Sequence, residues 1–495
     1  MRYVPSEARI VWSASDLKAA AECEFAWLRA IDARLGRCEA VEEPEDATLA
    51  RAGELGDVHE QRVLADYREK LGDGVVEIEK VSSRDAAALA GVVAQTDDAL
   101  RSGDAQLVFQ AAFATDEFVG FADFLLRDAD GRWRVQDSKL ARTARVTALM
   151  QLAAYVDQLD RLGIPRSDHV DLLLGDGTTS THAVSDILPL LEVRRDRLRE
   201  LIDDRDLASG AAGEAIAWGD GRGELHVTAC GRCATCEVEV VAHRDLLLVA
   251  GMRPSQRDRL RAAGIRTIDE LADAVTAPRG MSTDVFVSLR TQARLQREVP
   301  TDEDHPVPPY EVVNAAALGS LPRPDEGDIF FDFEGDPLYN EGPSTGPSTG
   351  SGQAAGTDWG IDYLFGWVDL SEQYSALWAH DMAEEKRALE EFCDDVALRR
   401  FTNPGMHIYH YAPYETSHLV NMAARHGVRE AEVDDLLRSE VFVDLYPVVR
   451  RAVRVGSRSY SIKKLEPLYM GDEVRTADVK KGDDSIVRYV ESRAL

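Results

Sequence analysis

Two strand-like runs joined by a short polar loop place the strongest constraint on how this chain folds. Residues 118–127 and 132–139 are mostly apolar or alternate between apolar and polar residues, and the sequence Asp-Ala-Asp-Gly separates them. A loop of this kind, with Gly131 in the left-handed conformation, is typical of a β-hairpin with a three-residue connection. The sequence therefore predicts an antiparallel hairpin in this region.

This register would place two acidic side chains opposite each other. Asp123 pairs with Asp137, and Lys139 shares the face of Asp137 because strand side chains alternate with period two. Like charges at paired positions destabilise a hairpin, so a bound cation would explain them. Two carboxylates for a hard divalent cation and one ammonium group to orient water are the components of metal-dependent phosphodiester hydrolysis. The alternative for an isolated Asp-x-Lys is a solvated surface hairpin.

Two helical segments add polar residues to this set. Residues 53–60 open a helical pattern and place His59 near its start, where a metal or phosphate contact is plausible. Residues 149–159 form a second helical pattern, in which Gln151 and Tyr155 are four residues apart and share a face. Taken alone, each of these features would indicate ordinary helix packing.

Together, these motifs resemble those of the PD-(D/E)XK nucleases of the RecB type, in particular the CRISPR-associated RecB-like exonucleases and RecB-like nucleases fused to helicases. The resemblance covers about the first half of the chain and implies a restriction-endonuclease-like α/β core that binds Mg²⁺ or Mn²⁺. The residues that it assigns are His59, Asp123 and Asp137 as metal ligands, Asp123, Asp137 and Lys139 as catalytic residues, and Gln151 and Tyr155 as substrate contacts.

Cysteine usage points to a second metal centre. The chain has six cysteines, no secretory segment at its start and no apolar run near the length of a membrane span, which indicates a reducing, soluble, cytoplasmic setting without disulfides. Four of the cysteines form a candidate ligand set, namely Cys23, Cys230, Cys233 and Cys236. Related nucleases hold a 4Fe–4S cluster with one early and three late cysteines, and this resemblance implies the same here. The second late gap is shorter than the family pattern, so Zn²⁺ and no metal stay open. Cys38 and Cys393 are expected to be ordinary buried thiols.

The charge balance restricts how the chain can meet nucleic acid. A formal net charge of −31 argues against nonspecific coating of nucleic acid, so DNA is expected to contact local patches. Residues 450–464 contain six basic and no acidic residues, together with Tyr460, which could stack on a base. A solvated basic edge is the alternative interpretation.

A connector is predicted after the cysteines. Residues 245–272 form a pattern of two short helices joined near Gly251, which resembles a helix-hairpin-helix module whose turn presents backbone N–H groups to phosphate. Such helical pairs also serve as plain connectors. The prolines and acidic residues of 299–309 indicate a linker.

The last third contains another pair of carboxylates. Asp332 and Glu334 lie in an apolar strand-like run and point to one face, the spacing at which two carboxylates can share a metal. This motif resembles the first motif of the DEDD exonucleases of the RNase H-like superfamily. Residues 360–369 suggest the next strand, and residues 407–415 a later strand and turn in which Glu415 could supply the third acid. A surface Glu is the alternative for Glu415.

The closing helix of that family, with its Tyr-x-x-x-Asp signature, is not found before Leu495, so this domain is expected to be truncated or diverged and inactive by itself. Residues 341–356 form a Gly/Ser/Pro-rich insertion that is expected to be a disordered loop. Helices are predicted near 83–102 and 187–204, where they would pack around the nuclease sheet.

The sequence thus predicts an α/β protein in three parts: a nuclease domain over residues 1–240, a helical connector over 241–300, and an incomplete RNase H-like domain over 310–495. The expected activity is Mg²⁺- or Mn²⁺-dependent hydrolysis of DNA, from the ends of single strands, in repair or recombination. One alternative is a catalytically silent DNA-binding scaffold that works with a helicase partner. Another is a nuclease that acts on RNA.

Overall fold

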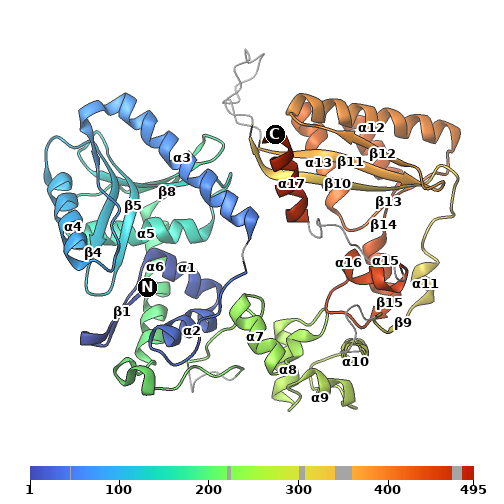
Figure 1. Ribbon diagram of the computed structural model, residues 1–495, viewed down its shortest axis with the longest axis horizontal. Helices are drawn as coiled ribbons and strands as arrows, with labels where there is room; N and C mark the ends of the chain where they lie inside the picture. Colours follow the sequence, from blue (N-terminus) through green and yellow to red (C-terminus); the bar gives the residue numbers. More distant parts are fainter. Residues whose placement is uncertain (45, 220–224, 300–306, 341–358, 471–481, 495) are drawn as a thin grey trace. The chain divides into compact units, whose positions relative to one another are not determined.

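The computed structural model describes residues 1–44, 46–219, 225–299, 307–340, 359–470 and 482–494, and the chain divides into two compact units (Figure 1). The first unit holds Met1–Glu239, and the second begins at Val240. The predicted connector therefore belongs to the second unit. The predicted insertion at 341–356 lies outside the described residues, as does most of the predicted linker at 299–309.

A six-stranded mixed sheet in the order β3-β4-β5-β6-β7-β8 forms the centre of the first unit. Its strands are β3 (Val75–Glu77), β4 (Leu107–Ala114), β5 (Val119–Arg127), β6 (Trp133–Lys139), β7 (His169–Leu174) and β8 (Thr179–Ala183). Strands β4, β5 and β6 form an antiparallel meander, whereas β7 runs parallel to β6. A parallel neighbour requires a crossover, and α5 (Val146–Arg161) supplies it.

Helices cover this sheet, and a short hairpin of β1 (Arg2–Val4) and β2 (Arg9–Val11) precedes them. The other helices of the first unit are α1 (Ala14–Glu22), α2 (Glu24–Arg34), α3 (Ala47–Leu71), α4 (Ala86–Arg101), α6 (Val184–Asp203) and α7 (Ala234–Ala242), the last of which runs into the second unit. The helices predicted near 83–102 and 187–204 are confirmed as α4 and α6. Apolar residues of α4 such as Leu89 and Val92 are buried, because one face of this helix packs on β4.

The predicted hairpin is present with the predicted register. Phe124 pairs with Gln136 and Arg127 with Trp133 across β5 and β6. Gly131 has a φ of 78°, the left-handed conformation that the three-residue loop requires. One step beyond the Phe124–Gln136 pair, the same register sets Asp123 opposite Asp137.

The second unit begins with a small helical subdomain. It contains the 3₁₀ turn η4 (Leu246–Leu248) and helices α8 (Pro254–Ala262), α9 (Ile268–Asp273) and α10 (Thr283–Arg297), packed around a core that includes Leu246, Leu260 and Phe286. The prediction of a helix before Gly251 is wrong, because Leu246–Leu248 form only a 3₁₀ turn there. Val249 is extended, with φ −71° and ψ 120°, and Gly251 has a φ of 79°, so the turn does not continue into a longer helix.

A five-stranded sheet in the order β12-β11-β10-β13-β14 follows. Its strands are β10 (Ile329–Asn340), β11 (Trp359–Asp369), β12 (Tyr374–Trp378), β13 (Ile408–His410) and β14 (Phe442–Asp444). Strands β10, β11 and β12 are antiparallel, whereas β13 and β14 run parallel to β10. The strand predicted at 360–369 is confirmed as β11. Phe331, Phe333 and Phe365 of this sheet pack with Phe392 in one apolar core.

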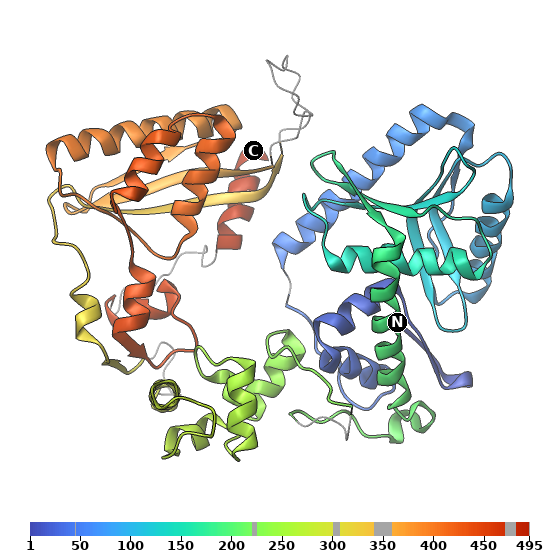
Figure 2. The same cartoon turned by 180° about the vertical axis from the view of Figure 1, so that it is seen from behind.

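The remaining elements complete the second unit. They are α12 (Met382–Thr402), α13 (Tyr414–His426), α14 (Glu430–Arg438), α15 (Leu445–Ala452), α16 (Ile462–Leu465), α17 (Gly482–Ala494), the short helix α11 (Ala315–Leu318), and the two-stranded sheet of β9 (Tyr310–Val312) and β15 (Val453–Val455). Helix α12 lies along the five-stranded sheet in both views (Figures 1 and 2). The ring of Tyr489 in α17 stacks on Tyr363 with ring centroids 3.8 Å apart. Within the described ranges, none of the helices combines the length and apolar character that a membrane crossing needs.

Candidate functional site

The hairpin of the first unit brings an acidic pair and a lysine together. Asp137 of β6 is only 2% exposed, and its Oδ2 lies 2.6 Å from Nζ of Lys139. The backbone N–H of Ser138 donates to Oδ2 of Asp123 on β5 at 3.3 Å. Apart from Lys139 and the Asp123 carboxyl group, the described residues offer the oxygens of Asp137 no hydrogen-bond partner. The predicted placement of these three side chains is therefore confirmed.

Burial and charge together set the protonation of this group. Burial raises the pKa of Asp137 well above its usual value, and the neighbouring Asp123 carboxylate raises it further. Burial alone would lower the pKa of Lys139, but Asp137 and Asp123 more than offset this and raise it. Lys139 therefore stays charged at neutral pH. Two close carboxylates with few hydrogen bonds suit a hard divalent cation, which would offset their mutual repulsion.

His59 lies on α3, in the middle of the helix and not near its start as predicted, because the helix begins at Ala47. Its Nδ1 accepts a hydrogen bond from Arg62 and its Nε2 donates to the carbonyl of Leu173, both at 3.2 Å. Burial lowers the pKa of the ring, so His59 is neutral. Both ring nitrogens are used within the protein in this conformation, and a role as metal ligand stays a prediction.

Gln151 and Tyr155 lie on α5 as predicted, but they differ in exposure. Gln151 is half-buried, whereas Tyr155 is 5% exposed and its hydroxyl donates to the carbonyl of Phe121 at 2.7 Å. A Cβ atom at Gly120 would lie 3.0 Å from the Tyr155 ring, so this close packing favours glycine. Tyr155 thus joins α5 to β5 close to the acidic pair. Direct contact of its side chain with a substrate does not fit this geometry.

The four predicted cysteine ligands come together although Cys23 is far from the others in sequence. Their Sγ atoms all lie within 4.8 Å of one another, with 3.5 Å between Cys23 and Cys236 and 3.9 Å between Cys230 and Cys236. Backbone N–H groups of Ala26 and Cys230 donate to Sγ of Cys23, each at 3.4 Å. The hydrogen bond from Cys236 lowers the pKa of Cys23 to about 5, which favours the thiolate form that binds metal.

The size of this cysteine group bears on which metal it can hold. Four thiolates around one tetrahedral Zn²⁺, with Zn–S bonds of about 2.3 Å, have sulfurs about 3.8 Å apart. The separations of 3.5 and 3.9 Å agree with a single ion. A 4Fe–4S cluster would require the sulfurs to move apart. The donor set therefore fits a metal, with the geometry nearer to Zn²⁺ than to the predicted cluster.

Further contacts tie the two ends of the first unit together around the cysteines. Arg197 donates to both carboxylate oxygens of Glu24, at 2.7 and 2.9 Å, and the N–H of Thr228 donates to the same carboxylate at 2.8 Å. Cys38 is half-buried and not buried as predicted, and its Sγ lies 3.7 Å from the carbonyl oxygen of Arg29. Cys393 is a buried thiol, as predicted.

A second carboxylate cluster lies on β10 of the second unit. Asp332 and Glu334 share one face of the strand, since Phe331 and Phe333 between and beside them are buried on the other. Desolvation and the neighbouring Glu415 and Glu334 raise the pKa of Asp332 to about 7, although Asp332 is exposed to solvent. Glu415 is 3% exposed in the first turn of α13, so its interpretation as a surface residue is wrong.

Comparison with known protein families matches both units. Residues 11–241 match the family model of the PD-(D/E)XK nuclease superfamily, and residues 353–492 match that of the RNase_H superfamily. The chain has a two-domain nuclease architecture. No curated protein gives a significant match. The RNase H match includes Glu415 but begins after Asp332 and Glu334, which the fold places beside it.

Glu60 of the PD-(D/E)XK domain belongs to the acidic group but was not predicted from the sequence. It is half-buried on α3, and Gln110 donates to its Oε1 at 2.8 Å. Burial and the charge of Asp123 raise the pKa of Glu60, and its own charge acts on Lys139. The sequence signal that could have identified Glu60 was its position directly after His59, on the helix whose side chains reach the hairpin.

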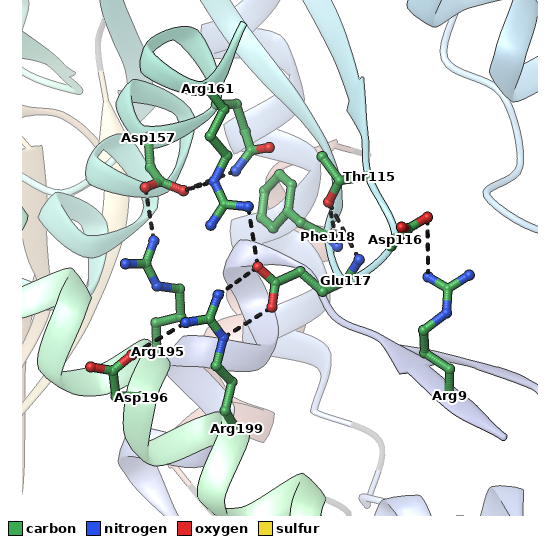
Figure 3. Close-up of polar contacts among 11 residues, drawn as sticks. Arg9, Thr115, Asp116, Glu117, Phe118, Asp157, Arg161, Arg195, Asp196 and Arg199 are labelled. Atoms are coloured by element: carbon green, nitrogen blue, oxygen red, sulfur yellow. Dashed lines mark hydrogen bonds and ion pairs between the residues drawn. The ribbon is translucent and has the colours of Figure 1, made fainter. Parts of the chain in front are cut away.

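An ion-pair network fixes the start of β5 in the PD-(D/E)XK domain (Figure 3). Glu117, in the turn before β5, pairs with Arg199 of α6 and with Arg161 of α5 at 2.6 and 3.2 Å. Arg161 and Arg195 also pair with Asp157, each at 2.8 Å. These contacts join the strand that carries Asp123 to helices α5 and α6.

The basic segment at 450–464 of the second unit is structured. Tyr460 is buried, and its hydroxyl donates to Oε1 of Gln292 at 2.8 Å. The prediction that this ring stacks on a base is therefore wrong, since α10 covers it. Arg450 and Arg454 of the same segment remain at the surface, exposed and half-buried respectively.

Proposed function

We propose that this chain is a metal-dependent deoxyribonuclease whose chemistry resides in the PD-(D/E)XK domain. The observation that carries this proposal is the buried Asp137 carboxylate held 2.6 Å from the Lys139 ammonium group and opposite Asp123. Lys139 offers one positive charge to the buried Asp137 and the half-buried Asp123, so a bound cation would offset the remaining repulsion between the two carboxylates. The superfamily match supports a phosphodiester substrate.

Each side chain has a distinct role in this proposal. Asp123 and Asp137 would hold Mg²⁺ or Mn²⁺, which when bound polarises the scissile phosphate and activates water. Lys139 is held by Asp137 and donates hydrogen bonds to the attacking water or to a phosphate oxygen, where negative charge develops. Glu60 adds a third carboxylate that can accept a hydrogen bond from water. Gln151, which is half-buried on α5, remains available for a substrate contact.

The finer assignments rest on resemblance to the RecB-like nucleases. We infer single-stranded DNA ends as substrate, and repair or recombination as the setting, with the cysteine group as a metal staple between the ends of the first unit. The Asp332, Glu334 and Glu415 cluster would then guide DNA or support the fold. A helicase partner would supply single strands.

The test compares the two acidic clusters in one assay. End-labelled single-stranded and duplex DNA are incubated with Mn²⁺ and with the unaltered protein, Asp137→Asn or Asp332→Asn. The proposal expects label release that Asp137→Asn abolishes and Asp332→Asn preserves. Label release that depends on Asp332 alone would move the chemistry to the second unit, and no release from any strand would refute nuclease activity.

A further inference from the structure

An open pocket of about 310 Å³ lies in the second unit, between the connector and the basic segment. Its walls include the turn at Gly251, residues of α10, and the C-terminal part of α15 with the strand that follows. The charged and polar residues that line it are Arg253, Asp284, Ser288, Arg450 and Arg454. We call it the arginine pocket. These residues belong to neither carboxylate cluster.

Two glutamines one turn apart on α10 build this pocket. Gln296 accepts from the N–H of Ala250 at 2.9 Å and donates to the carbonyl of Leu248 at 2.8 Å, which fixes the turn at Gly251. Gln292 is 2% exposed and donates to the carbonyl of Val455 at 2.7 Å, and thereby fixes the other wall. The two amides also bond to each other at 3.1 Å. Segments far apart in sequence are thus held by one buried polar network.

Arg454 is held rigidly by neutral acceptors. Its guanidinium donates to Oγ of Ser288 at 3.1 and 3.3 Å, to the carbonyl of Arg450 at 2.7 Å and to that of Val453 at 3.1 Å. Arg450 lies over the ring of Tyr446 and approaches the Gly251 turn, where a Cβ atom would be 3.7 Å from its guanidinium. Both cations are therefore oriented before any ligand arrives.

The charge of the pocket is not neutralised within the protein. In the part of the chain that the structure describes, no carboxylate forms an ion pair with Arg253, Arg450 or Arg454, and Asp284 is the acidic residue of the lining. Neighbouring arginines of α10 differ, since Arg294 pairs with Glu298 at 2.9 Å and Arg297 with Asp273 at 2.9 Å. In a chain of net charge −31, three arginines without acidic partners around one cavity point to an anionic ligand.

We propose that the arginine pocket binds a phosphate of the nucleic-acid strand and anchors the substrate on the second unit. Planar guanidinium groups match phosphate geometry, and two fixed arginines favour a backbone phosphate over a base. This inference rests on the proposed nuclease function, because a strand is the polyphosphate that such a protein meets. In this proposal the connector and the basic segment contact the phosphate together, through their arginines and not through Tyr460.

The test is strand binding without catalysis. Fluorescence anisotropy measures the dissociation constant of labelled oligothymidylate in EDTA for the unaltered protein and for Arg450→Gln/Arg454→Gln. The control is Arg323→Gln/Arg387→Gln, which changes the net charge equally outside the pocket and the basic segment. The pocket variant is expected to bind about tenfold more weakly, with a salt dependence about 1.4 units shallower, as for two lost phosphate contacts. The control should change less than about twofold. Equal effects of the two variants would overturn the proposal.

A second measurement needs no variant, so that a folding defect cannot obscure the result. Hydrogen exchange of the unaltered protein with oligothymidylate should slow in residues 250–257, 284–292 and 450–460. Binding of the strand without slower exchange in these residues overturns the proposal. Slower exchange with inorganic phosphate or thymidine monophosphate, but not with the strand, overturns it as well. Because EDTA excludes cleavage, failure here is distinct from failure of the nuclease assay with Mn²⁺.

Discussion

Asp137 and Lys139 form a close ion pair, with Oδ2 and Nζ 2.6 Å apart, in a strand that is almost fully buried at Asp137. A two-residue spacing places both on one face of β6, and the hairpin register adds Asp123 from β5. Three charged groups are therefore concentrated where the fold would otherwise favour apolar side chains. If the proposed function holds, this arrangement would bind a cation at some cost to the stability of the protein itself.

Glu60→Gln should weaken catalysis without unfolding the protein. Removal of its charge reduces the negative field around Asp123 and removes an acceptor for water, so we expect kcat/KM to fall about tenfold. Glu54→Gln, at an exposed position of the same helix, is the matched control and should be silent. Initial rates of cleavage over a range of Mn²⁺ concentrations measure the effect. Equal rates for the two variants would exclude Glu60 from the site.

Tyr155→Phe separates structural support from substrate contact. Loss of the hydrogen bond to the Phe121 carbonyl should lower the free energy of unfolding by about 1 kcal/mol. The KM for DNA should stay within about twofold, since the side chain is buried. Denaturant unfolding measures the free energy of unfolding, and steady-state kinetics measure the KM for DNA. A large rise in KM at unchanged stability would restore the predicted substrate contact.

The sequence predicts features that depend on neighbouring residues better than features that depend on packing between distant segments. Local signals succeeded where chemistry and geometry coincide, as at Gly131, whose left-handed turn fixes the register of Asp123 and Asp137. The spacing in β10 likewise predicted that Asp332 and Glu334 share a face. Such features depend on residues close in sequence, and turn geometry and strand periodicity determine them.

Long-range packing was harder to predict. Tyr460 was expected on a surface, but Gln292 of a distant helix bonds its hydroxyl. Glu415 is buried for a similar reason, because His410 at the end of β13 contacts its carboxylate at 3.1 Å. The boundary of α3 was misplaced because Asp46, seven residues before the predicted start at Gly53, caps the helix through its side chain. The Tyr460 error concerns a contact between segments far apart in sequence, whereas the Asp46 cap is a local signal that the prediction missed.

Cys230→Ser should remove the metal of the cysteine group. Metal analysis of protein purified without oxygen should find a bound centre in the unaltered chain and in Cys38→Ser, but none in Cys230→Ser. Since metal binding contributes folding free energy, the midpoint of thermal unfolding should fall by about 10 °C in Cys230→Ser. One zinc per chain would agree with the Sγ separations, and iron with inorganic sulfide would assign the 4Fe–4S cluster. Metal-free unaltered protein would contradict the site.

Glu117→Gln tests the ion-pair network at the start of β5. Burial opposes ionisation, but Arg199 and Arg161 hold the pKa of Glu117 below its ordinary value of 4.5. A folded-state pKa below the unfolded value stabilises the protein above about pH 4.5, and this contribution is lost as pH falls through the folded pKa. The variant should therefore be about 1 kcal/mol less stable at neutral pH, and equal to the unaltered protein in stronger acid. Urea unfolding at several pH values measures the difference, and a difference independent of pH would contradict it.

The most direct measurement of the central claim is the rate of Mn²⁺-dependent release of end label from single-stranded DNA by Lys139→Ala. Lys70→Ala, on the exposed end of α3, is the matched control. The account predicts that Lys139→Ala lowers kcat about a thousandfold while DNA binding in EDTA persists, and that the control retains full activity. Undiminished cleavage by folded Lys139→Ala would contradict the assignment of the chemistry to the Asp123, Asp137 and Lys139 site.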